Sequence, residues 1–187
     1  MQDKDIILSI CLATYNQPDK VQRFFESIIP QIDSGIEIVI RDDSSDLETE
    51  NLIKNYSEKI SIPVRYFKGK KEGLDVAIIF LTQEAKGKYV WWIGDDILTD
   101  GIIKRMINLV KKFPDTSFIL VNSCDIHNKI NVALKTEKDK FFDNRDQIIK
   151  MVEKDIGILG FITATVFKKE KALSGIEASK KYIGSAF

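Results

Sequence analysis

Residues 89–96 read Tyr-Val-Trp-Trp-Ile-Gly-Asp-Asp, so an apolar run ends abruptly at a glycine and two adjacent carboxylates. The run is too short for a helix and rich in β-formers, which predicts a buried strand. Both of its faces are apolar, as is typical of a central strand in a sheet that is covered on both sides. Asp95 and Asp96 follow the carboxyl end of this strand, where open α/β sheets bind their ligands.

Two adjacent carboxylates at such a position indicate a cation. At a separation of about 5 Å and an effective dielectric of about 20, they repel by roughly 3 kcal/mol. A divalent cation removes that repulsion, and hard ions such as Mg²⁺ prefer carboxylate oxygens. Asp95 and Asp96 therefore predict a metal that holds a phosphorylated ligand. The alternative for an isolated Asp-Asp pair is a solvated turn that caps the next helix.

Apolar strands alternate with amphipathic helices on both sides of this segment. We expect strands over residues 6–13, 36–40, 64–67, 89–93 and 117–121. Helices with one apolar stripe are expected after Pro18, after residue 45, from Asp75 to about Ala85, and over 102–113. The regular alternation predicts right-handed crossovers and a Rossmann-like, mostly parallel sheet flanked by helices in a single α/β domain.

Local details of this prediction can be compared with a structure. The second helix is expected to begin at a capping box formed by Ser45 and Glu48, with Asp46 as a mere turn former. Its inner face is expected to carry Leu47, Ile53 and Tyr56. Beyond residue 121 the alternation weakens, and the expected elements are an edge strand over 132–136, a helix over 147–152 and a strand over 160–167.

The composition is that of a globular intracellular protein. The 187 residues are 44% hydrophobic and 30% charged, which suits one domain with a real core. Basic and acidic residues number 28 each, so no global field attracts nucleic acid. Cys11 and Cys124 lack metal-ligand spacing and are expected as reduced core residues. With no apolar stretch of membrane-spanning length, a cytoplasmic location is expected, and peripheral association with the inner face of the membrane stays open.

Several chemistries are excluded by motifs that the sequence lacks. It contains no G-x-x-x-x-G-K-[ST] and no G-x-G-x-x-G after the first strand, so phosphate is not held on a glycine-rich loop. The single histidine, His127, excludes a histidine-clustered zinc site and is expected at the surface. Residues 42–53 resemble a calcium-binding loop, but Leu47 replaces the required glycine and Ile53 the required glutamate.

Polar side chains follow three of the expected strands where each strand ends. Tyr15 follows the first strand, Asp42 and Asp43 follow the second, and Asp95 and Asp96 follow the fourth. Because the carboxyl ends of parallel strands share one edge of the sheet, we expect these groups to converge. An aspartate accepts a base N–H or a ribose hydroxyl, a tyrosine stacks on a base, and a metal neutralises a diphosphate. The sequence therefore predicts a nucleotide-diphosphate site.

Three segments carry a resemblance to a known family. Residues 9–16 (SICLATYN), 37–46 (EIVIRDDSSD) and 87–96 (GKYVWWIGDD) resemble successive signatures of the family 2 glycosyltransferases, which have the GT-A fold. The Gly-Leu-Asp of residues 73–75 and the paired tryptophans are most similar to the abequosyltransferase-like branch, which builds bacterial surface polysaccharides. The resemblance covers residues 6–120 clearly and extends more faintly to residue 187.

The resemblance implies a role for each polar residue at the shared edge. Tyr15 would contact the nucleotide, and Asp43 would accept the base N–H with Asp42 as its neighbour. Asp95 would face the ribose or the sugar, and Asp96 would bind Mn²⁺ or Mg²⁺. Together these roles define a nucleotide-sugar-binding site with a DXD-like metal motif.

The resemblance also assigns residues outside these strand ends. Asp75 lies where the family places a helix start that contacts the nucleotide or the sugar. Residues 1–121 correspond to the nucleotide-sugar-binding half, and 122–187 to part of the acceptor-side half. The catalytic base is unassigned, because the family supplies it from the segment around or after residue 187; Asp155 and Glu177 are the candidates within the chain.

The end of the sequence bears on activity. The apolar segment 182–187 has no cap or polar tail, so we expect a C-terminally truncated chain that binds nucleotide yet turns over poorly. The function predicted is metal-dependent transfer of a sugar from a nucleotide-diphosphate donor to a glycan or lipid-linked acceptor in bacterial surface polysaccharide synthesis. A nucleotidyltransferase is one rival, although it would show a glycine- and basic-rich phosphate loop early in the chain. A non-catalytic nucleotide-sugar-binding module is another.

Overall fold

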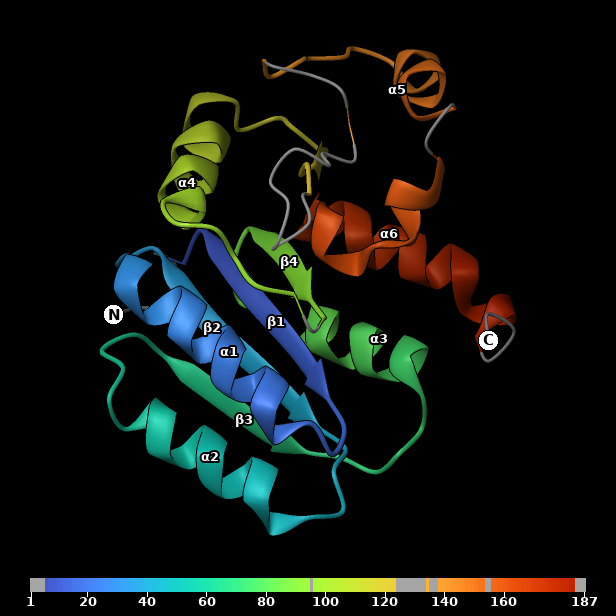
Figure 1. Cartoon of the computed structure of the whole chain (residues 1–187). Helices are drawn as coiled ribbons and strands as arrows, with labels where there is room; N and C mark the ends of the chain where they lie inside the picture. The colour runs from blue at the N-terminus through green and yellow to red at the C-terminus, as the bar shows by residue number, and fades with distance from the viewer. Residues whose placement is uncertain (1–5, 95, 124–133, 135–137, 154–155, 184–187) are drawn as a thin grey trace.

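The computed structural model describes residues 6–94, 96–123, 134, 138–153 and 156–183. In this part of the chain six strands form one sheet in the order β3-β2-β1-β4-β6-β5 (Figure 1). The first four strands of the chain are parallel, whereas β6 runs antiparallel between β4 and β5. The strands are β1 (Leu8–Thr14), β2 (Ile36–Asp42), β3 (Val64–Lys68), β4 (Tyr89–Ile93), β5 (Phe118–Leu120) and β6 (Thr165–Lys168).

Helices cover both faces of the sheet. One face carries α1 (Pro18–Ile28), α2 (Leu47–Ser57) and α4 (Ile102–Lys112), and the other carries α3 (Leu74–Glu84) and α6 (Lys169–Ser179) (Figure 1). A further helix, α5 (Arg145–Val152), contributes to a small separate apolar cluster. Four short 3₁₀ turns complete the described elements: η2 (Ile29–Gln31), η3 (Ile156–Gly160), η4 (Ile162–Ala164) and η5 (Lys180–Tyr182). The expected mostly parallel α/β sheet is confirmed.

The predicted periodicities explain why these elements form. In α1, Pro18 occupies the first turn, where its missing N–H costs nothing. The apolar stripe Val21, Phe24, Phe25 and Ile28 is at most 1% exposed and packs against β1 and β2. Burying each of these side chains contributes about 1.5–3 kcal/mol, so the stripe fixes which face of α1 lies on the sheet.

Strand alternation sends the paired tryptophans to opposite faces, as expected. Trp91 is fully buried in the larger core and donates from Nε1 to the carbonyl of Thr163 at 2.8 Å. Trp92 packs against the smaller core under α3 and donates from Nε1 to Thr82 Oγ1 at 3.0 Å. Both indole N–H groups are therefore satisfied, which buried aromatic rings with a polar atom require.

The start of α2 differs from the prediction by one residue. Asp46, not Ser45, is the N-cap, and its side chain accepts the N–H of Thr49 at 2.8 Å. The Ser45 hydroxyl instead bonds the side chain of Asn16. Because the cap is shifted, Leu47 becomes the first helical residue and is 71% exposed. The capping-box prediction and the inward placement of Leu47 were therefore wrong.

The segment after residue 121 also differs in part. The expected helix over 147–152 is confirmed by α5, but the expected strand over 160–167 is shortened to β6 and preceded by η3 and η4. The reason is that Thr163 bonds both Trp91 and the N–H of Gly94, which holds η4 as a turn against the end of β4. The expected edge strand over 132–136, apart from residue 134, lies outside the described residues, as do Cys124 and His127.

Candidate functional site

The carboxyl ends of β2, β1 and β4 lie side by side, because β1 pairs in parallel with both neighbours. The strand order reverses at β1, because β2 and β3 lie on one side of it in the sheet and β4 lies on the other side. Such a topological switch point is where open α/β sheets bind ligands. These three strands lie next to one another in Figure 1, and Tyr15, Asp42, Asp43 and Asp96 end or follow them in the sequence. The structure therefore brings them to one edge, called here the carboxyl edge.

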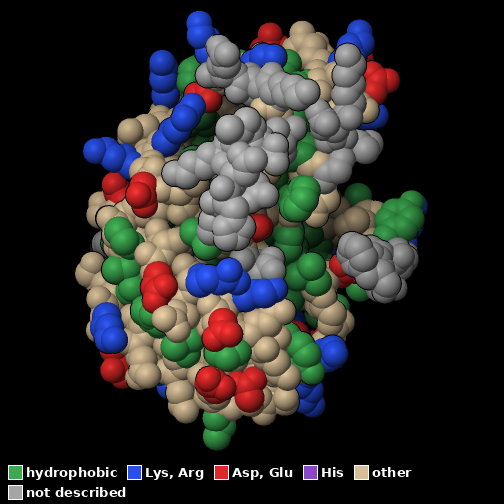
Figure 2. All heavy atoms as spheres, in the orientation of Figure 1, with side chains coloured by type: hydrophobic (Ala, Val, Ile, Leu, Met, Phe, Trp, Pro, Cys, Tyr) green, Lys and Arg blue, Asp and Glu red, His purple; other side chains and the backbone are tan. Residues whose placement is uncertain are grey.

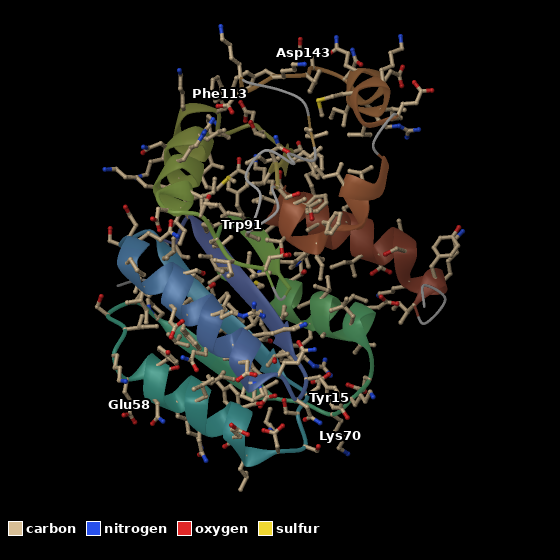
Figure 3. The ribbon with its side chains drawn as sticks, viewed as in Figure 1. Tyr15, Glu58, Lys70, Trp91, Phe113 and Asp143 are labelled. Atoms are coloured by element: carbon tan, nitrogen blue, oxygen red, sulfur yellow. The ribbon has the colours of Figure 1, made fainter. Side chains whose placement is uncertain are left out.

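Tyr15 lies in a loop that is bonded to the loop after β2. The residue is 38% exposed, and the Lys71 ammonium lies 4.5 Å from the ring centroid. The next residue, Asn16, has a left-handed backbone (φ 50°), and its N–H donates to Ser44 Oγ at 2.7 Å. Figure 3 places Tyr15 beside Lys70 at the carboxyl edge, away from Phe113 at the other end of the sheet. The tyrosine ring is thus fixed at the edge and open to a ligand.

Asp42 is fully buried at the end of β2, and three groups donate hydrogen bonds to its carboxylate. They are the backbone N–H of Ser44, the Tyr66 hydroxyl and the Lys68 ammonium, each at 2.9 Å. Burial opposes ionisation, but the bonds from Ser44, Lys68 and Tyr66 outweigh it, so the pKa of Asp42 lies below its ordinary value. Burial and the bond to Asp42 raise the pKa of Tyr66. The Asp42 carboxylate thus faces inward and organises the turn.

Asp43 is nearly buried, with 9% of its side chain exposed, and one arginine anchors it. Arg41 donates from Nε to Asp43 Oδ1 at 2.8 Å. The backbone N–H of Asp43 donates to the carbonyl of Thr14 at 3.0 Å, which joins the ends of β1 and β2. An ionised carboxylate accepts hydrogen bonds only, which is the property that reading a base N–H requires.

Asp75 lies in the first turn of α3, half-buried, with Gly73 as the N-cap. Gly73 has φ 101°, a backbone conformation that favours glycine and turns the chain sharply into the helix. The helix start is tied to β2, because Arg41 donates to the carbonyl of Val76. Asp75 therefore belongs to an element that is anchored to the carboxyl edge.

Asp96 is exposed after the end of β4, while Asp95 lies outside the described residues. The next helix, α4, begins at Ile102 with Gly101 as its N-cap. Asp96 is five residues before that cap, so the alternative that this acid merely caps the next helix does not hold. Its Oδ2 lies 4.0 Å from the point where a Cβ on Gly94 would stand, so the small residue leaves room beside the carboxylate.

Thr163 is a residue at this edge that the sequence did not reveal. Its hydroxyl accepts the N–H of Gly94 at 3.1 Å, and its carbonyl accepts the Trp91 indole. The turn that leads to Asp96 is thus held from η4, about 70 residues away in the chain. Nothing in the spacing distinguishes Thr163, because its neighbours fit a strand pattern as well as a turn.

Few side chains in the described part of the carboxyl edge could bind a metal together with Asp96. Within the described residues no group of three or more His, Cys, Asp or Glu side chains could hold a metal ion. Mg²⁺ in nucleotide sites is bound through one or two carboxylates plus substrate phosphates, with water completing the shell. One exposed aspartate at the edge fits this kind of site, in which the diphosphate supplies further oxygen ligands.

Of the two candidate catalytic bases, the structure describes only Glu177. Asp155 lies outside the described residues. Glu177 lies on α6, is 73% exposed and pairs with Lys180 at 2.6 Å, one turn later.

Acidic and basic side chains are interspersed over the face seen in Figure 2, in keeping with the balanced composition. No helix among the described residues is both long and apolar enough to cross a membrane.

These features define a nucleotide-binding type of α/β domain with an acidic ligand edge at its switch point. The profile of Glycosyl transferase family 2 matches residues 9–165, most of the chain. The chain therefore belongs to glycosyl transferase family 2, as the resemblance implied.

Named relatives and solved structures agree with this assignment. Abequosyltransferase RfbV from Salmonella typhimurium is 24% identical over 97% of this chain, which spans 58% of RfbV. Residues 1–349 of S. aureus TarS in complex with UDP superpose with a TM-score of 0.65 at 16% identity, covering 88% of this chain and 47% of that 1–349 chain. Mannosyltransferase PcManGT from Pyrobaculum calidifontis, in complex with GDP-Man and Mn²⁺, gives 0.55 at 18% identity over 66% of this chain and 37% of that one. The fold is thus GT-A, and the chain spans less than two thirds of the relatives' length.

Proposed function

We propose that this chain carries the nucleotide-sugar-binding site of a glycosyltransferase that moves a sugar from a nucleotide-diphosphate donor to a glycan or lipid-linked acceptor. Bacterial surface polysaccharide synthesis is the setting that the likeness to RfbV supports. A cytoplasmic location, at the inner face of the membrane, suits both the donor and the acceptor. Residues 1–121 form the donor half and 122–187 part of the acceptor side.

One observation carries the proposal: the ends of β1, β2 and β4 present complementary groups at one edge. Tyr15 offers an exposed ring for a base, and Asp43 an anchored acceptor for a base N–H. Asp96 offers an exposed carboxylate where the diphosphate would lie. By the family resemblance Asp95, which lies outside the described residues, would face the ribose or the sugar, and Asp75 would contact the donor from the start of α3. Asp42 supports the turn that holds Asp43.

A divalent metal fits the donor set, and Asp96 is the residue that would hold it. Mn²⁺ or Mg²⁺, when bound, supplies positive charge that neutralises the diphosphate leaving group. The protein residues position the nucleotide so that the sugar faces the acceptor side. Transfer also requires a base for the acceptor hydroxyl, and Asp155 and Glu177 remain the candidates.

A nucleotidyltransferase is less well supported. A nucleotidyltransferase would hold triphosphate on a glycine- and basic-rich loop after the first strand. Here that loop is Tyr-Asn-Gln between β1 and Pro18, without glycine or a basic residue. A binding module without turnover would use the same donor site, so it differs from the proposal only in the transfer step.

The donor site is testable by calorimetry against UDP-, GDP-, CDP- and dTDP-sugars with Mn²⁺. We expect the parent chain to bind at least one of them in a metal-dependent way. Asp96→Ala should abolish the Mn²⁺-dependent part of the affinity while leaving the fold intact. Asp100→Ala, an exposed aspartate in the same loop, is the matched control and should bind like the parent.

The results of these binding experiments test the assignment of Asp96 and the proposed function separately. Binding of nucleotide with Mn²⁺ by Asp96→Ala at parental affinity would show that this carboxylate is not the ligand. If the parent binds none of the four sugar nucleotides with Mn²⁺ or Mg²⁺, the proposed function itself is wrong.

A further inference from the structure

Arg41 is a buried arginine in β2, one residue beyond the apolar strand that the sequence predicts over 36–40. It is 5% exposed, one residue before the end of β2, and its side chain points to the α3 side of the sheet. Its guanidinium carbon lies 5.2 Å from the centroid of the Phe80 ring on α3. A buried charge is costly unless it is paired and hydrogen-bonded, so its partners indicate what it is for.

The partners of Arg41 come from three separate segments. Nε donates to Asp43 Oδ1 at 2.8 Å, after β2. Nη2 donates to Glu72 Oε2 at 2.6 Å and to the carbonyl of Lys70 at 3.3 Å, both in the loop after β3. Nη1 donates to the carbonyl of Val76 at 3.5 Å, in the first turn of α3. One side chain thus joins the base-reading acid, the lysine-bearing loop and the helix start.

Gly69, in the loop after β3, lies so close to the Arg41–Asp43 ion pair that only a glycine fits there. A Cβ at Gly69 would stand 2.0 Å from Asp43 Oδ1 and 2.9 Å from Arg41 Nε, so no larger residue fits without displacing them. The backbone N–H of Gly69 also donates to the carbonyl of Asp42 at 2.8 Å. The loop after β3 is therefore pressed against the Arg41–Asp43 pair along its backbone.

The same loop reaches the exposed tyrosine of the nucleotide site. Lys71 lies over the Tyr15 ring at 4.5 Å, and Glu72, the next residue, is the one held by Arg41. The side chain of Glu72 is 56% exposed, whereas that of Arg41 is almost fully buried, so the arginine is the fixed end of this ion pair. Figure 3 shows Lys70 beside Tyr15, on the same side of the molecule. The ion pair between Glu72 and Arg41 is thus one of the contacts that hold this loop next to Tyr15.

We propose that Arg41 is a positioning residue that orients Asp43 for the base and, through Glu72, holds residues 69–72 over the nucleotide. This inference rests on the proposed function. Oδ1 of Asp43 is taken by Arg41, and among the described residues no hydrogen bond reaches Oδ2, which is left for the ligand. A guanidinium suits the task, because its rigid fork of donors bonds two carboxylates at once, whereas an ammonium acts as a point charge.

The test compares nucleotide affinity in variants that cut each end of the tie. Calorimetry with Mn²⁺ uses whichever of UDP, GDP, CDP and dTDP the whole parent chain binds most tightly. Glu72→Gln keeps the Arg41–Asp43 pair, and we expect its Kd to rise roughly fivefold. Arg41→Lys loses the fork, and we expect a rise of roughly tenfold or more. Hydrogen exchange of the peptide over 69–73 should accelerate in both free variants.

Glu84→Gln is the matched control. Glu84 pairs with Arg65 at 2.6 Å at the opposite end of α3, so the variant removes a similar ion pair away from the carboxyl edge. We expect its Kd to equal that of the parent, with a melting temperature like that of Glu72→Gln. A tie with no positioning role would lower the two melting temperatures alike and leave both affinities unchanged.

The failures can be told apart. Parental affinity in Glu72→Gln and Arg41→Lys overturns this inference alone, as does an equal loss in Glu84→Gln. A parent chain that binds none of the four nucleotides overturns the proposed function and this inference with it. If Arg41→Lys does not fold, Glu72→Gln still decides, because its side chain is more than half exposed.

Discussion

Replacing Asp42 by asparagine removes one buried charge and keeps the shape of the side chain. The carboxylate accepts bonds from Ser44, Tyr66 and Lys68, and an amide can accept at one atom while its NH₂ faces the remaining donors. A hydrogen bond to a charged group contributes about 1.5–3 kcal/mol. Lys68 is 37% exposed and regains water, so its share is at most about 1 kcal/mol. We expect the free energy of unfolding to fall by about 2–3 kcal/mol.

Urea unfolding at neutral pH measures this loss, with Asp139→Asn as control. Asp139 pairs with Arg105 at 2.7 Å, but both side chains are more than half exposed, so the control should change stability by less than about 0.5 kcal/mol. Equal losses in the two variants would refute the argument that burial makes the Asp42 bonds strong.

A comparison of the parent with Asp42→Asn should also show how the stabilisation by Asp42 depends on pH. Folding lowers the pKa of Asp42 below its ordinary value of 3.8, so the folded state favours the ionised carboxylate. The stabilisation is complete above the unfolded pKa and is lost as pH falls through the lower folded pKa. The difference in unfolding free energy between the parent and Asp42→Asn should therefore be constant near neutral pH and shrink below about pH 4. A difference that grows on acidification would contradict the assignment.

Three further substitutions test helix capping and local packing by urea unfolding. Asp46→Ala removes the N-cap of α2 and should lower the urea midpoint, whereas Ser45→Ala should leave the midpoint nearly unchanged; equal shifts would show that Asp46 is not the dominant cap. Gly87→Ala would place a Cβ 2.6 Å from the backbone nitrogen of Ser9, so we expect a loss of about 3 kcal/mol or more, and near-parental stability would show that β1 can yield there.

Much of the fold could be predicted because its determinants are local. The 3.6-residue stripe of α1 and the alternation at Trp91 and Trp92 report burial directly from neighbouring positions. Regular alternation of strand and helix then predicts crossovers in one direction, and parallel strand ends meet at one edge. Tyr15, Asp43 and Asp96 could therefore be placed at a common edge without a structure.

The remainder depends on partners that lie far away in the chain. Thr163 acts through bonds to Trp91 and Gly94, about 70 residues earlier, and no spacing reports such a pair. Glu37 is a fully buried acid within β2 that accepts from Ser9 Oγ and the N–H of Lys86, both at 2.6 Å. Such groups interrupt an apolar pattern without revealing their partners.

The adjacent acids Asp42 and Asp43 show why one motif can contain two roles. Along β2 successive side chains point to opposite faces, so Asp42 joins Tyr66 on the α1 and α2 side, while Arg41 faces α3. Asp43, just past the strand, turns back to Arg41, which donates to its Oδ1. Asp42 therefore stabilises the turn, whereas Asp43 is held in place by Arg41. Replacing Asp42 should mainly lower stability, whereas replacing Arg41 should mainly lower nucleotide affinity. The two measurements therefore distinguish the hydrogen bonds of Asp42 from those of Arg41.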